Sequence, residues 1–450
     1  MNTSTAEQNL SSFDPKVRQQ ALDALVAAWQ AGEIPCAPPN DQLNLHCHTF
    51  FSYNGYGHSP SALAWLARKL GWYAVGTVDF DVLDAMQECL DACDRVQVRG
   101  MAGMETRAYL PQFATREINS PGEPGILYYM GVGFVYEKTL SPADEALADL
   151  RQRAAERNRD VVARVNAYLD PVVIDYDRDV LPLTPAGNAT ERHILLAYDI
   201  AARKHFPERE DLLRFWASRL EMDVAQVDAF MGDEPFPHDA IRSKLIKRGG
   251  VGYVQPGPDT FPPFDEVTDT IIKFRAIPTY AWLDGTSAGE QAIEELLALA
   301  VSKGVGAINI IPDRNWNIKN PDERALKIQK LYEVVQLAHD MDLPILVGTE
   351  MNKAGQKVVD DFDAEPLRPL HADFIAGAHF VYGHTVMERA LRQGYQSEWA
   401  LEYLPERRDR NAFYQEVGRL VLPGKAALAR VAQLSDAREP QAILARLQEL

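Results

Sequence analysis

Several apolar segments of the sequence end in a side chain that could bind a cation. His46 and His48 end the first of them, Asp79 ends the second, Glu105 ends the third, and Glu350 follows the last. Imidazoles combined with carboxylates suit a divalent ion such as Zn, Mn or Fe better than Ca or Mg, which prefer oxygen ligands alone. If the segments are strands of one barrel, their carboxyl ends meet at one mouth. The residues therefore predict a site for a divalent ion such as Zn, Mn or Fe.

Each of these residues also has a simpler interpretation. Alternate residues of any strand share a face, so the His46-x-His48 spacing is a weak motif when taken alone. Asp79 could instead cap the helix that follows it. Arg192 and Arg314 could hold an anionic group, because a guanidinium offers two parallel donors to a phosphate or carboxylate, or they could form surface salt bridges.

The elements that must position these residues alternate between strands and helices. Apolar periodicity predicts helices over residues 60–70, 82–96, 290–302 and 321–341. Such alternation is typical of a parallel α/β sheet or barrel. Strands are expected at residues 43–46, 72–78, 98–106, 126–134, 278–282, 305–311 and 344–348, and residues 374–382 could add another strand or a buried turn.

The pattern divides the chain into four parts. Residues 1–40 form an N-terminal helical cover, and residues 41–140 together with 250–385 form the barrel. Between them, residues 141–249 are rich in Leu, Ala, Arg and Glu and keep a helical period, which predicts a helical insertion. Residues 386–450 are charged and helical, so we expect a C-terminal helical tail.

Composition excludes several classes of protein. The chain has 450 residues, and 46 Lys and Arg against 64 Asp and Glu give a formal net charge of −18. This balance disfavours nucleic acid and anionic membranes as partners. A small anionic substrate would need a local cation, which a bound metal would supply. The four cysteines contain no C-x-x-C pair, and no apolar run approaches the length of roughly 20 residues that crosses a bilayer. We therefore expect a cytoplasmic protein.

The opening motifs resemble a known family. Residues 45–49 (Leu-His-Cys-His-Thr), then residues 77–79 (Thr-Val-Asp), then residues 103–105 (Gly-Met-Glu) are similar to the start of the polymerase and histidinol phosphatase (PHP) superfamily. Residues 190–193 resemble the segment that carries a histidine at the start of the family's inserted helical subdomain. The resemblance implies a distorted, TIM-like (β/α)7 barrel of the PHP type, up to three metal ions and, in most members, phosphoester hydrolysis.

The chain departs from the family's pattern at several histidine positions. Phe80 stands where the family has a histidine after the second-strand aspartate, and Trp282 replaces the histidine of an alanine–histidine–proline strand. Asn352 replaces the terminal histidine, and residues 313–315 occupy a region where members often carry another. These departures imply that a third metal position has been lost and that the pocket is more apolar.

Carried over residue by residue, the resemblance implies a reduced set of metal ligands. Asp79 lacks its usual partner, and a second ion would need help from Asp284. The ligands that the resemblance retains are His46, His48, Glu105, His193 and Glu350.

The sequence thus predicts a metal-dependent hydrolase, most plausibly a phosphoesterase that uses a metal-activated water at the mouth of the barrel. Two alternatives remain open. The barrel could have lost catalysis and serve as a binding or regulatory protein, or it could be a single-metal isomerase or lyase acting on a sugar-like substrate. His379 and His384 could complete a metal shell or could be hydrogen-bonded core residues.

Overall fold

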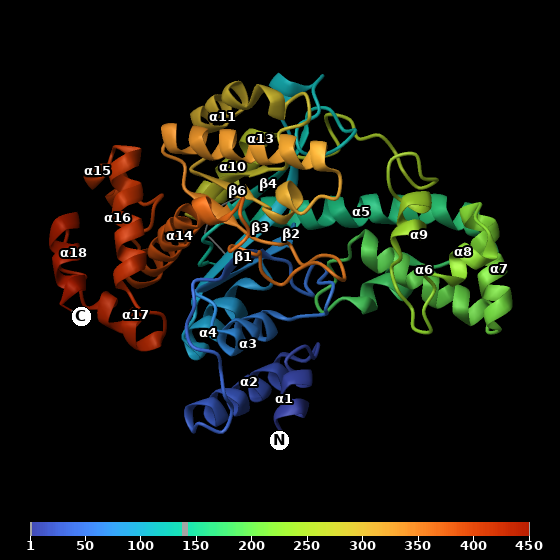
Figure 1. Cartoon of the computed structure of the whole chain (residues 1–450), viewed down its shortest axis with the longest axis horizontal. Coiled ribbons are helices and arrows are strands. Elements are labelled where there is room, and N and C mark those ends of the chain that lie inside the picture. The colour runs from blue at the N-terminus through green and yellow to red at the C-terminus, as the bar shows by residue number, and fades with distance from the viewer. Residues whose placement is uncertain (1, 137–142, 450) are drawn as a thin grey trace.

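A seven-stranded sheet forms the centre of the molecule (Figure 1). The computed structural model describes residues 2–136 and 143–449. The strands are hydrogen-bonded in chain order, and all seven strands that the sequence predicts are present. They are β1 (Leu43–Cys47), β2 (Ala74–Phe80), β3 (Arg99–Tyr109), β4 (Ile126–Val132), β5 (Ile277–Trp282), β6 (Ala307–Ile310) and β7 (Ile345–Val347).

The sheet is mixed and nearly closes into a barrel. β4 runs antiparallel to both β3 and β5, whereas the other neighbours are parallel. A bridge between Cys47 and Glu350 closes the barrel between β1 and β7. The Glu350 N–H donates to the His46 carbonyl, and the His48 N–H donates to the Glu350 carbonyl, both at 2.7 Å. Gly348 allows this approach, because a Cβ there would lie 2.4 Å from the His46 nitrogen. The fold is therefore an α/β barrel, as predicted.

Helices surround the barrel, and local sequence signals fix where several of them begin. The Asp14-Pro15, Ser59-Pro60 and Asn320-Pro321 pairs each place a capping side chain before a proline at the first helical position, and each cap accepts a backbone N–H. The surrounding helices are α3 (Pro60–Leu70), α4 (Met86–Val96), α10 (Phe264–Lys273), α11 (Ile293–Ser302) and α13 (Pro321–Asp340), with α1 (Thr3–Asn9) and α2 (Pro15–Gln30) covering α3 and α4.

A group of helices projects from one side of the barrel. α5 (Ala143–Leu169), about 40 Å long, has Leu150 in the barrel's core and Val165 in a separate apolar cluster confined to residues 162–245. The sequence places the boundary of the insertion at residues 140 and 141, which lie outside the described residues. The other helices of this part are α6 (Glu191–His205), α7 (Arg209–Leu220), α8 (Val224–Asp228) and α9 (Asp239–Leu245).

The C-terminal part is helical and shares the barrel's core. The expected strand or turn at residues 374–382 is wrong, because this segment lies within α14 (His371–Leu391). α14 is buried along much of its length, so its apolar residues show no single face from which a helix could be predicted. It packs against the start of β7, at the end of the barrel opposite the bridge at Glu350. It is followed by α15 (Glu398–Tyr403), α16 (Arg407–Leu420), α17 (Lys425–Ala432) and α18 (Pro440–Gln448).

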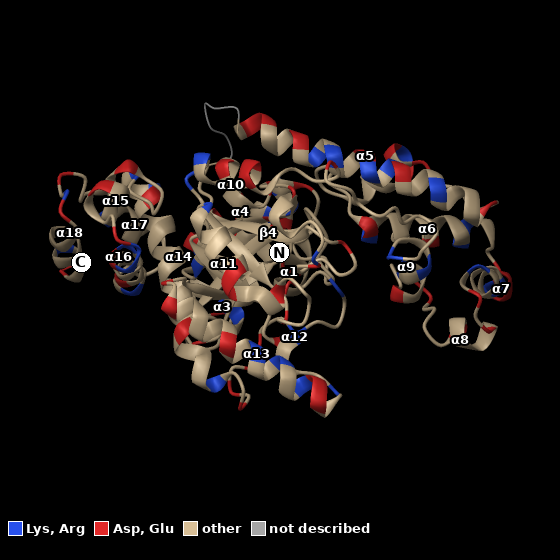
Figure 2. Cartoon of the chain, turned by 90° about the horizontal axis from the view of Figure 1, so that it is seen from above, with Lys and Arg blue, Asp and Glu red and all other residues tan. Residues whose placement is uncertain are grey.

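Charged side chains are concentrated on the outer helices. Figure 2 shows Asp, Glu, Lys and Arg along α5, α7 and α13, around a centre with few charges. None of the helices in the described part of the chain combines the length and the apolar composition needed to span a bilayer.

Candidate metal centre

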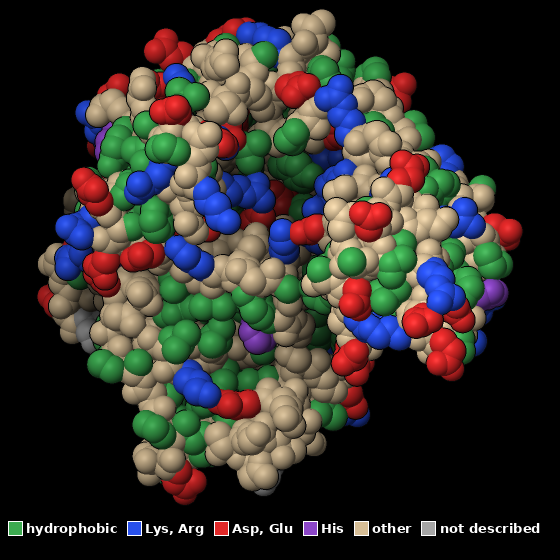
Figure 3. Space-filling view, turned by 45° about the vertical axis from the view of Figure 1, so that its right-hand side comes forward, with side chains coloured by type: hydrophobic (Ala, Val, Ile, Leu, Met, Phe, Trp, Pro, Cys, Tyr) green, Lys and Arg blue, Asp and Glu red, His purple; other side chains and the backbone are tan. Residues whose placement is uncertain are grey.

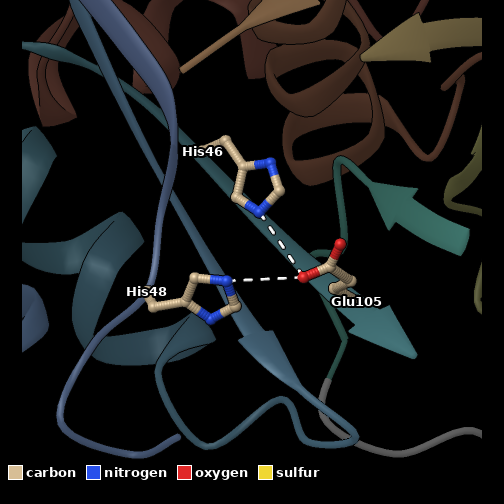
Figure 4. A group of neighbouring side chains, drawn as sticks. All are labelled: His46, His48 and Glu105. Atoms are coloured by element: carbon tan, nitrogen blue, oxygen red, sulfur yellow. Dashed lines mark ion pairs between the residues drawn. The ribbon is translucent and has the colours of Figure 1, made fainter. Parts of the chain in front are cut away.

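Three of the predicted ligands meet at the mouth of the barrel, and we call His46, His48 and Glu105 the triad. His46 lies near the end of β1, His48 follows that strand on the same face, and Glu105 extends from β3 (Figure 4). Their ligand atoms all lie within 4.8 Å of one another. The Glu105 Oε2 atom is 3.7 Å from His46 Nε2 and 3.4 Å from His48 Nε2.

Hydrogen bonds on the far side of each ring fix which nitrogen carries the proton. His46 Nδ1 lies 2.9 Å from the Asn309 Oδ1 atom, which only accepts, so Nδ1–H donates. The Ser52 hydroxyl donates to Asp79 and lies 3.1 Å from His48 Nδ1, so it accepts from that nitrogen. In its neutral form each imidazole therefore presents the unprotonated Nε2 lone pair to Glu105.

This arrangement fits a bound cation. Both Nε2 atoms are buried without a hydrogen-bond partner, and the exposed fractions of His46, His48 and Glu105 are 1%, 0% and 4%. When the imidazoles are neutral, three acceptors face one another and repel unless a proton or a metal cation lies between them. Ligand atoms around a tetrahedral ion with bonds of about 2.1 Å are about 3.4 Å apart, which is close to the 3.7 and 3.4 Å between Glu105 Oε2 and the two Nε2 atoms. The residues thus fit one divalent ion.

The charges of the three side chains are mutually dependent. Burial acts to lower the pKa of His46, but Glu105 and Glu350 outweigh it, so the pKa is raised. Burial acts to raise the pKa of Glu105, but the two imidazoles outweigh it and hold that pKa below its ordinary value. His46 and Glu105 thus each favour the charged form of the other, and a divalent cation would stabilise the carboxylate in place of the imidazolium.

Asp79 supports the loop after β1. Its carboxylate accepts the Thr49 N–H at 2.8 Å, the Thr49 hydroxyl at 2.7 Å and the Ser52 hydroxyl at 2.5 Å. It does not cap the next helix, because α4 begins after Ala85. Burial raises the pKa of Asp79, against the influence of His48 and the three hydrogen bonds. Asp79 is thus linked to the predicted ligand His48 through Ser52.

Glu350 lies beside the triad in an unusual backbone conformation. Its φ is +63° and that of Met351 is +55°, a region that non-glycine residues rarely adopt and that often marks a functional site. Its Oε2 atom accepts from Arg314 at 2.5 Å and from Asn352 at 3.2 Å. Arg314, from the short helix α12 (Asp313–Trp316), thus holds a carboxylate of the protein at the mouth of the barrel.

His193 lies at the start of α6 and is not part of the group of three. The Thr190 N–H donates to its Nδ1 at 3.1 Å, so the neutral ring carries its proton on Nε2. Burial lowers its pKa to about 4. The Tyr53 ring packs against it, with ring centroids 5.3 Å apart. In this arrangement His193 offers an N–H donor rather than a lone pair.

The remaining predicted residues bind other partners. Arg192 donates to Asp239 at 2.9 Å and to the Pro237 carbonyl. Asp284 accepts from Thr286 and forms an ion pair with Lys327 at 3.1 Å. The structure therefore brings neither residue into the group formed by His46, His48 and Glu105.

The two histidines of α14 lie at the opposite end of the barrel. His379 Nε2 bonds the Tyr73 hydroxyl at 2.5 Å. His384 Nε2 donates to the Gly133 carbonyl, and its Nδ1 accepts from the Tyr395 N–H, both at 2.9 Å. These are hydrogen-bonded structural residues, which was one of the two interpretations that the sequence left open.

Asn309, which orients His46, was not among the residues predicted from the sequence. Asn309 is a polar residue inside the apolar strand β6, and that contrast is the signal that could have identified it. Phe80, at a position where the PHP resemblance expects histidine, packs on the His48 ring with centroids 4.4 Å apart. The site therefore combines a polar support on one side with an aromatic wall on another.

The fold and the site define an α/β barrel with a three-residue candidate metal centre. No family model and no curated protein matches the chain. A solved amidohydrolase from Chromobacterium violaceum, with sulfate and no metal bound, is 16% identical with a TM-score of 0.47, over 74% of this chain and 96% of that one. A candidate metal-dependent phosphoesterase from Bifidobacterium adolescentis is 18% identical with a TM-score of 0.46, over 75% and 98%. Because both TM-scores are below 0.5, the candidate metal site is argued from the geometry of this chain alone.

Proposed function

We propose that this chain is a metal-dependent hydrolase of the PHP type that acts as a phosphoesterase on a small anionic substrate. The observation that carries the proposal is the convergence of two buried imidazole lone pairs and one carboxylate with no donor between them. One divalent ion, Zn, Mn or Fe, would be held by His46, His48 and Glu105. When bound, it supplies an activated water and polarises a phosphoryl oxygen.

The chain's own residues would prepare this site in three ways. Asn309 and Ser52 hold the two imidazoles in the tautomer that exposes Nε2. Phe80 covers one side of His48 and limits the access of bulk water. His193, with its proton on Nε2 and its pKa lowered to about 4, is a neutral donor suited to hold a substrate oxygen.

A screen of phosphate monoesters and diesters with added Mn²⁺ or Zn²⁺ tests the proposal. We expect hydrolysis that His46→Ala and Glu105→Ala each reduce by at least about 100-fold, because each removes a ligand. His205→Ala and Glu333→Ala are matched controls at exposed positions of α6 and α13 and should retain activity. If no ester is hydrolysed, or if the two site variants match their controls, the proposal is wrong.

A further inference from the structure

A cavity of about 840 Å³ lies between the mouth of the barrel and the helical insertion. Figure 3 shows a hollow beside the projecting helical part, with Lys and Arg side chains around it. The cavity borders the triad through aromatic residues that line it. Phe80 packs on His48. Tyr128 of β4 lies near Glu105: burial raises the pKa of this tyrosine, and the Glu105 carboxylate raises it further.

Basic and acidic side chains both line this cavity. They are Arg107, Arg157, Arg164, Lys247 and Arg248, together with Asp81, Glu117, Glu123, Asp160 and Glu191. Arg107 pairs with Glu123 at 3.0 Å, and Lys247 pairs with Glu191 at 3.2 Å. Arg157, on α5, forms no ion pair with any of the described residues, so its guanidinium is available to a bound anion.

Arg157 makes few polar contacts although its surroundings are enclosed. Its guanidinium donates to the Thr260 carbonyl, at 3.5 Å. Its guanidinium carbon lies 4.6 Å from the centre of the Phe261 ring, and that of Arg107 lies 4.1 Å from the same ring. The aromatic ring thus holds two guanidinium groups in place while leaving most of their N–H donors for a ligand.

The protonation behaviour of the basic groups agrees with this geometry. Burial lowers the pKa of Lys247 to about 7, assisted by Arg242, Arg107 and Arg192. Burial also lowers the pKa of Arg157 to about 10, against the attraction of Asp81, whose carboxylate accepts from Thr106. A bound anion would offset the repulsion that these cations experience.

We infer that this cavity binds a second anionic group of the substrate, a carboxylate or phosphate remote from the bond that is hydrolysed, through Arg107, Arg157 and Lys247. The inference rests on the proposed function and narrows it to organic esters with two anionic groups. The body of such a molecule would lie along the apolar and aromatic lining, which includes Val161 and Ile246. Guanidinium groups suit this role because they bind oxyanions with two parallel hydrogen bonds.

Steady-state kinetics of the metal-loaded full chain test the inference. We would compare phenyl phosphate with its 3-carboxy and 4-carboxy derivatives. We expect at least one carboxylated ester to have a KM about tenfold lower than phenyl phosphate. Lys247→Met and Arg157→Met should each abolish that difference. Lys244→Met is the matched control, because this lysine of α9 pairs with Glu221 and does not line the cavity, so it should preserve the difference.

A binding measurement separates failure of the inference from failure of the proposed function. Benzoate and its neutral analogue benzamide would be titrated into the chelator-treated full chain. We expect benzoate to bind more tightly, with a preference that Lys247→Met and Arg157→Met reduce about tenfold and Lys244→Met does not. If no ester is hydrolysed, this titration alone decides the inference. Equal affinity for benzoate and benzamide, or a preference that survives in both variants, would overturn it.

Discussion

At the scale of single residues, the site depends on which ring nitrogen each histidine exposes. His46, His48 and Glu105 could be predicted from the sequence because each lies where an apolar strand ends, and strand ends converge in a barrel. Asn309 and Ser52 could not be assigned in the same way. The role of Asn309 depends on side chains that are 263 residues apart meeting in space. The role of Ser52, four residues after His48, depends on the conformation of the loop that follows β1.

Ser52 provides a direct test of this support. Ser52→Ala removes the acceptor of His48 Nδ1–H and the link to Asp79. We expect the affinity for Zn²⁺ or Mn²⁺ to fall by about 10- to 100-fold, as is typical when the partner of a ligating histidine is lost. Competition with a chromophoric chelator measures the affinity.

The matched control for Ser52 is Ser302→Ala, at the end of α11. That hydroxyl bonds only a carbonyl of its own helix, so its loss should leave the metal affinity unchanged. An unchanged affinity in Ser52→Ala itself would mean that the hydrogen bond to His48 does not orient the ring for binding.

At the scale of elements, the sequence predicted where the strands lie better than how they pair. Each of the seven strands has an apolar run that identifies it, but the antiparallel direction of β4 was not predicted. The segment between β3 and β4 contains only the short turn Pro111–Phe113 and no crossover helix, which a parallel neighbour requires. The absence of a helical pattern between residues 106 and 126 was the available signal.

Closure of the barrel between β1 and β7 depends on one glycine. A Cβ at residue 348 would lie 2.4 Å from the His46 nitrogen and 2.5 Å from Asn44 Oδ1. We therefore expect Gly348→Ala to destabilise the fold by about 1–3 kcal/mol, the usual cost of overpacking. It should also weaken metal binding, because the strand that carries His46 must shift. Urea unfolding and metal titration measure the two effects.

Gly257→Ala is the matched control for Gly348. A Cβ there meets nothing within 4 Å. Its stability and metal affinity should equal those of the unmodified chain. If Gly348→Ala behaved in the same way, the close approach of β1 and β7 would not be needed for the site.

At the scale of the whole molecule, the net charge of −18 says little about the site. Most carboxylates lie on outer helices, as Figure 2 shows, whereas the candidate site uses one or two of them. The helical content of the insertion could be predicted from its periodicity. The cavity between the insertion and the barrel could not, because it is formed by residues from β3, α5 and the segment after α9, whose mutual positions depend on the complete fold.

His384 connects the C-terminal helices to the barrel, and its burial predicts a pH dependence of stability. Burial lowers its pKa below the ordinary value of about 6.5. As the pH falls below 6.5, the unfolded chain therefore takes up a proton that the folded chain does not. This contribution to stability is present above pH 6.5 and decreases as the pH falls below it.

Urea unfolding at pH 7.5 and 5.5 measures this contribution. His384→Asn keeps an acceptor for the Tyr395 N–H but cannot titrate, so it should lose less stability between the two pH values than the unmodified chain does. His205→Asn, at an exposed position of α6, should retain the full dependence. If stability depended on pH identically in His384→Asn and His205→Asn, His384 would not be a buried neutral residue that contributes to this dependence.

The central claim is that two imidazole lone pairs and one carboxylate bind a divalent ion, and metal analysis tests it most directly. The chain would be purified without chelator and measured by elemental analysis, alongside His46→Ala, Glu105→Ala and the surface control His205→Ala. We predict about one Zn, Mn or Fe per chain in the unmodified protein and in the control, and a loss of that ion in the two site variants. A metal-free protein that also fails to bind added Zn²⁺, Mn²⁺ or Fe²⁺ would show that His46, His48 and Glu105 do not form a metal site.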